Sequence, residues 1–98
     1  NTYLRQSDGV PTNLVTGNFI VPFNCELTDI TAACSVNATW DAEVHVGGTS
    51  VGALTITAQT RGLVNSLGVA ITAGSRVSLY CDGTSIEDPC ITAWFTET

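Results

Sequence analysis

Hydrophobic and polar residues alternate with a period of two along most of the chain, the pattern of β-strands with one buried face. In the segment 39–46, Trp40, Ala42 and Val44 share one face, whereas the charged residues share the other. Similar alternation predicts about eight short strands in total. They lie near residues 2–5, 18–23, 27–36, 39–46, 51–58, 67–72, 76–81 and 91–97.

Turn-forming dipeptides separate these segments, at Asp8-Gly9, Gly17-Asn18, Gly47-Gly48, Arg61-Gly62, Ala73-Gly74 and Asp82-Gly83. Gly47-Gly48 predicts a tight hairpin, because two adjacent glycines supply the positive φ angles that such turns need. Pro22 cannot donate a backbone hydrogen bond, so the strand around it is expected at an edge of the sheet or at a bulge. Helical periodicity is not found. The pattern therefore predicts an all-β fold, an antiparallel β-sandwich of jelly-roll type.

The composition narrows the functional classes. Ninety-eight residues suit one domain, spanning 1–98, and the absence of methionine suggests a piece excised or processed from a longer chain. The chain has three arginines, no lysine and nine acidic residues, which gives a net charge of −6. This charge argues against binding nucleic acid. No apolar run approaches the roughly 20 residues of a membrane-spanning segment, so membrane insertion is not expected. Only 12% of residues are charged, a sparse surface that favours burial against neighbouring subunits.

The four cysteines form two pairs with eight residues between partners, a spacing that does not suit zinc. If 27–36 is extended, Cys25 and Cys34 lie about 30 Å apart, too far for a bridge. We therefore favour Cys34–Cys81 inside the core and Cys25–Cys90 near one end. The alternative is that all four are free thiols, which pack as small hydrophobic residues.

Three patterns resemble catalytic or metal-binding motifs. The segment 48–52 matches G-x-S-x-G, but its surroundings predict a hairpin instead of the strand–turn–helix that a nucleophile elbow requires. Asp41 and Glu43 share a strand face with His45, where we expect a solvated or interface surface, and His45 as a pH-sensitive subunit contact. The acidic loop 82–88 lacks the spacing of an EF-hand. We expect no enzymatic activity, no cofactor and no metal.

Aromatic side chains on the outward faces are the strongest candidates for an interaction surface. If the strands 76–81 and 91–97 pair, Tyr80 lies opposite Thr92 and diagonal to Trp94. Exposed paired aromatics usually mark an interaction site. Two interpretations remain open for them, a subunit interface and a platform on which a sugar stacks.

Four segments carry a resemblance to a known group of proteins. They include the Val21-Pro22 opening and the Ala73-Gly74-Ser75 turn, and they span 19–30, 39–44, 71–80 and 89–95. In this order they resemble the small β-sandwich tip domains at the C-terminal ends of bacteriophage fibres and spikes. The resemblance implies a homotrimer on the virion that contacts host-surface glycans or proteins.

The leading hypothesis is thus a non-enzymatic fibre or knob domain, homotrimeric and bound to a host receptor such as a glycan. A secreted lectin-like carbohydrate-binding module is the second hypothesis. The third is a structural decoration or adhesin module without a ligand. The oligomeric state and the effect of changing Trp94 or Tyr80 would separate them.

Overall fold

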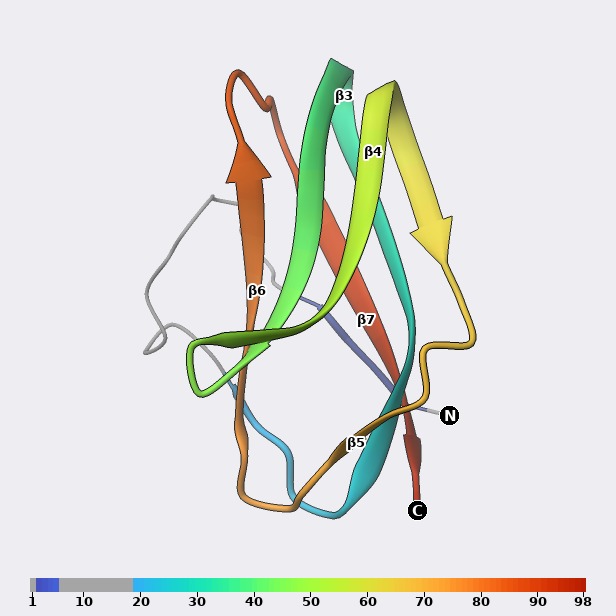
Figure 1. Ribbon diagram of the computed structural model, residues 1–98, viewed down its shortest axis with the longest axis vertical. Helices are drawn as coiled ribbons and strands as arrows, with labels where there is room; N and C mark the ends of the chain where they lie inside the picture. Colours follow the sequence, from blue (N-terminus) through green and yellow to red (C-terminus); the bar gives the residue numbers. More distant parts are fainter. Residues whose placement is uncertain (1, 6–18) are drawn as a thin grey trace.

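The computed structural model describes residues 2–5 and 19–98, and every regular element in this part of the chain is a β-strand (Figure 1). The all-β class predicted from the alternation is confirmed. The seven strands are β1 (Thr2–Arg5), β2 (Phe19–Ile20), β3 (Cys25–Val46), β4 (Thr49–Val64), β5 (Val69–Ile71), β6 (Arg76–Gly83) and β7 (Cys90–Glu97). The described residues hold no helix long and apolar enough to cross a membrane.

β3 is the central strand of a single antiparallel sheet, whose order is β1-β7-β3-β6-β2, with β4 and β5 also paired to β3. The first half of β3 pairs with β7 along one side, from Cys25 opposite Glu97 to Ala33 opposite Cys90. The second half of β3 pairs with β6, from Trp40 opposite Gly83 to Val46 opposite Val77. Along the other side, β3 pairs with β5 and then with β4.

The sheet folds over on itself where β3 and β4 both turn back at the same end of the molecule, at the top of Figure 1. The β3–β4 register shifts between Ala33 and Ala38 and again before Trp40, which bends both strands. Opposite this bend, Ala58 has a φ of 51°, and its backbone N–H donates to Thr39 Oγ1 at 3.0 Å. This is the left-handed region, which residues with a Cβ rarely occupy.

Close contacts across the fold show that its two layers touch. A Cβ built on Gly52, in the first half of β4, would lie 3.1 Å from Leu27 Cδ2, in the first half of β3. One hydrophobic core fills the space between the layers, with Leu27, Ile30, Trp40 and Val44 almost completely buried. Burial of these side chains is the main contribution to the stability of the sheet.

The predicted strands differ from the observed ones mainly at the bend. The segments 27–36 and 39–46 were expected to be separate strands, but they form the single strand β3, which reduces the count to seven. The predicted Gly47-Gly48 hairpin is confirmed, because both glycines have positive φ angles and Val46 pairs with Thr49. β2 is an edge strand, one of the two positions that Pro22 predicts, but it ends at Ile20 and is shorter than the predicted segment 18–23. The expected turns at Asp8-Gly9 and Gly17-Asn18 lie outside the described residues.

Candidate functional site

The two layers each present one outward face, and the residues singled out from the sequence divide between them. We call the outward face of β3 and β6 the acidic face, formed by Asp41, Glu43, His45, Tyr80 and Asp82. The outward face of β7, the first half of β3 and the second half of β4 is the threonine face. It includes Thr31, Arg61, Leu63, Thr92 and Trp94.

On the acidic face, three carboxylates gather across the β3–β6 pair. Asp41 is opposite Asp82, and one oxygen each from Asp41, Glu43 and Asp82 lies within 4.8 Å of the other two. Carboxylate oxygens are ligands for hard cations such as Ca²⁺, but partly exposed acidic clusters like this one are common without an ion. The sequence analysis treated Asp82 as part of a turn; β6 instead continues to Gly83, which brings Asp82 to this cluster.

His45 is held against the same face by two contacts. Its Nε2 lies 2.8 Å from Glu43 Oε1, and its ring centroid lies 5.0 Å from that of Tyr80, with the planes tilted by 37°. The His45 and Glu43 side chains are only 17% and 15% exposed. Both residues come from the same face of β3. This arrangement suits a packing surface better than acid–base catalysis, which needs a group positioned against a bound substrate.

On the threonine face, a row of side chains crosses three strands. Thr31 of β3 is opposite Thr92 of β7 on one side and Leu63 of β4 on the other. Trp94 Nε1 donates to Thr31 Oγ1 at 3.4 Å, which fixes the indole beside this row. The indole remains partly exposed, so its ring presents an apolar surface next to hydroxyl groups.

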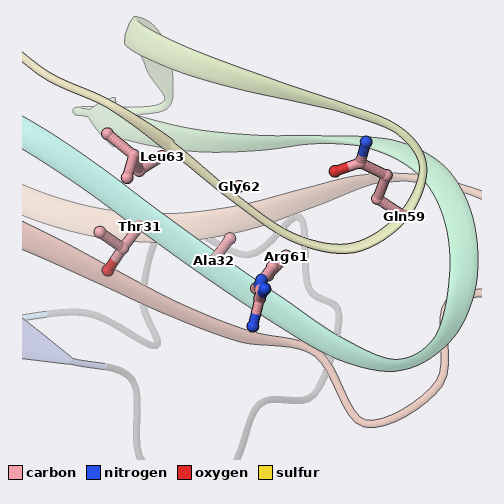
Figure 2. Close-up of a pocket in the computed structure, with 6 residues that line it drawn as sticks. All are labelled: Thr31, Ala32, Gln59, Arg61, Gly62 and Leu63. Carbon is pink, nitrogen blue, oxygen red and sulfur yellow. The ribbon is translucent and has the colours of Figure 1, made fainter.

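A shallow hollow of about 410 Å³ lies beside this row, over β3 and β4. Its lining consists of Thr31, Ala32, Gln59, Arg61, Gly62 and Leu63, and Figure 2 shows Gln59 and Leu63 at opposite ends of the lining β4 segment. Gly62 is opposite the buried residue Ala32, and a Cβ built on it would point toward Ile56 and Leu54 in the core. Leu63 is 64% exposed and supplies an apolar wall.

Arg61 brings a positive charge to this hollow. Its side chain is exposed, and within residues 19–98 it makes no ion pair or side-chain hydrogen bond. The sequence analysis assigned Arg61-Gly62 to a turn, whereas both residues lie inside β4, opposite Ala33 and Ala32. The rarity of cations in this chain was the signal that could have drawn attention to Arg61, one of three arginines.

The predicted Tyr80–Trp94 pair is wrong. β6 and β7 follow each other in the chain but do not pair, because β3 lies between them and bonds each with a different half. Tyr80 is therefore opposite Glu43 on the acidic face, whereas Trp94 is opposite Asp29 on the threonine face. The two aromatic side chains belong to separate surfaces.

The cysteines are free thiols in the structure, so neither of the favoured bridges is formed. Cys25 is opposite Glu97, and Cys90 is opposite Ala33, so these two cysteines lie at opposite ends of β7. Cys34 and Cys81 both pack with the core, where the Cys34 thiol donates to the Val36 carbonyl at 3.1 Å. Desolvation by burial raises the pKa of Cys81 from 9.0 to about 11, which favours its protonated form.

The G-x-S-x-G segment continues the β3–β4 hairpin, as expected, because Ser50 is opposite His45 within the strand pair. Comparisons with protein families, with curated proteins and with solved structures find no match to this chain.

Proposed function

We propose that the chain is a non-enzymatic attachment domain of a virion fibre or knob, which binds a host-surface glycan in the hollow beside Trp94. In this proposal the folded sheet is a β-sandwich of jelly-roll type, and the domain acts as a homotrimer outside the cell. The observation that carries the proposal is the combination of a hollow, an oriented indole and two polar side chains, Gln59 and Arg61, that have no side-chain partner within residues 19–98.

The chemistry of sugars matches this combination. A pyranose ring has apolar C–H faces that pack on an aromatic ring, and hydroxyl groups around its edge that need hydrogen-bond partners. Trp94 supplies the ring, whereas Gln59 and Arg61 supply amide and guanidinium donors across the hollow. All these residues come from strands of one sheet, so the site is organised before the ligand arrives.

The assembly part of the proposal is supported by β4. Within the described residues, β4 pairs with β3 alone, through 12 of its 16 residues, so the other edge of this strand has no strand beside it. β4 contains no proline, and Arg61 is its only charged residue. Long uncharged edge strands pair readily with other chains, and natural proteins usually block or cover them.

A glycan array with the purified chain, combined with sedimentation, tests the proposal. We expect binding to a defined set of glycans and a trimer at micromolar concentration. Trp94→Ala should abolish glycan binding, whereas Tyr80→Ala, an aromatic truncation on the acidic face, should retain it. A monomer that binds no glycan on the array would refute the proposal.

A structural decoration or adhesin module without ligand is the second candidate, and the unpaired edge of β4 favours it. In that case the assembly alone is functional. We expect an oligomer with no glycan bound, which a proline at Thr55 on the β4 edge would dissociate, because proline removes a backbone donor.

A further inference from the structure

We infer that the hollow over β3 and β4 binds a sugar through its carboxylate, so that the glycan is an acidic one. This inference rests on the proposed glycan-binding function and adds the chemical class of the sugar. The guanidinium of Arg61 is the group that would bind the carboxylate.

The charge of Arg61 is unusual in its surroundings. The chain carries nine acidic residues and three arginines, so most cationic side chains could find a carboxylate of their own. Glu43, Asp41 and Asp82 gather instead on the acidic face, on the other layer of the folded sheet. Within residues 19–98, Arg61 has no ion-pair partner, and it lines the hollow of about 410 Å³. Its donors are therefore available to a ligand.

The geometry of the guanidinium selects the ligand group. A planar fork of N–H donors matches the two oxygens of a carboxylate, and such paired charge-assisted bonds are stronger than bonds between neutral groups. The Thr31 hydroxyl, fixed by Trp94, and the Gln59 amide lie around the same hollow and can bond ring hydroxyls. Leu63 covers the apolar side of a sugar ring.

The hollow also has a suitable size. Its volume of about 410 Å³ lies within the range of roughly 300–1,000 Å³ that small-molecule sites have, whereas a folded protein segment would need the larger contact area of a protein interface. Attraction by one guanidinium acts within about 8 Å at physiological ionic strength, so it can prevail locally over the net charge of −6.

The test compares methyl glycosides of glucuronic, galacturonic and sialic acid with the methyl ester of each, by NMR titration of the full chain. The ester keeps the shape of the sugar and removes its charge. We expect at least one acid to bind more tightly than its ester. Arg61→Gln should lower the affinity for that acid roughly fivefold to tenfold, a loss appropriate to a charged pair in a half-open site.

Two variants complete the design. Arg76→Gln makes the same change in net charge on β6, which does not line the hollow, and should leave the acid's affinity unchanged. Arg61→Lys keeps the positive charge but lacks the planar set of guanidinium donors. Its affinity for the acid should lie between those of the wild type and Arg61→Gln. The affinity for the acid should decrease as salt is raised, because the attraction is screened.

Equal affinity for acid and ester, an equal loss in Arg76→Gln, or an affinity that increases with salt would each overturn the inference. In those cases the proposed function stands if the array shows glycan binding by the wild type and Trp94→Ala abolishes it. Binding of none of the six sugars overturns the inference as well, and the array then decides the proposed function separately.

Discussion

The close approach of β3 and β6 at Gly83 allows a quantitative prediction about stability. Gly83 is opposite Trp40 in the strand pair. A Cβ at position 83 would lie 2.7 Å from Trp40 Cβ and 3.1 Å from the carbonyl oxygen of Thr39. Because these atoms belong to the backbone or to the first carbon of a side chain, they cannot move aside by rotation. Gly83→Ala must therefore separate the two strands locally.

The expected cost follows from comparable substitutions. Forcing an extra methyl group into an occupied space costs about 1–3 kcal/mol. Replacing glycine also restricts the conformations of the unfolded chain, which raises the free energy of unfolding by about 0.4–1 kcal/mol. We therefore expect Gly83→Ala to lower the free energy of unfolding by about 1–2 kcal/mol, or roughly 4–12 °C in Tm for a domain of this size.

Gly52→Ala is the matched control. Its Cβ would lie 3.1 Å from Leu27 Cδ2, the end of a flexible side chain, and in ordinary contact with Ile30 and Leu67. The unfolded-state effect is the same in both variants, so their difference isolates the strand contact. Urea unfolding followed by tryptophan fluorescence measures both. If Gly83→Ala is as stable as the wild type, or if Gly52→Ala loses more, the reasoning is refuted.

Two further predictions concern the core and the bend. Because burial raises the pKa of Cys81 from 9.0 to about 11, its contribution to stability should be complete below pH 9 and disappear as the pH approaches 11. The thiol is partly exposed, so we expect a loss of about 1 kcal/mol. Urea unfolding of the wild type and Cys81→Ala between pH 9 and pH 11 measures this loss. The same dependence of the free energy of unfolding on pH in both proteins would contradict the prediction. At the bend, Ala58→Gly should raise the free energy of unfolding by about 0.5 kcal/mol, and Ala58→Val should lower it by more than about 1 kcal/mol, because φ is 51° there. Thermal unfolding of both variants ranks their stabilities against the wild type. A Val variant more stable than the Gly variant would show that the strain at Ala58 is absent.

The alternation of apolar and polar residues predicted which side chains of a strand are buried, because successive side chains point to opposite faces of the sheet. Ile91, Ala93 and Phe95 alternate with polar or partly exposed residues in their strand, and all three are buried, as are the alternating residues Leu54 and Ile56. The same pattern fails at the bend. Val36 continues the apolar alternation of the segment 30–36, but it is 41% exposed, because the register shifts between Ala33 and Ala38 interrupt the regular pairing there.

The partners of each strand could not be predicted in the same way. Pairing depends on where distant segments meet, and Tyr80 and Trp94 were placed together only because their strands follow each other in sequence. The insertion of β3 between those strands is a property of the whole fold. The hollow was missed for a related reason, since Arg61, Gln59 and Thr31 meet only after β3 and β4 pair.

The length of β3 has a mechanical consequence. A 22-residue strand bonds β4, β5, β6 and β7, and the remaining two strands join the sheet through β6 and β7. The threonine face and the acidic face are thus built on one continuous piece of backbone. A force applied to either face is therefore transmitted to the same strand, β3, and through it to every other strand of the sheet.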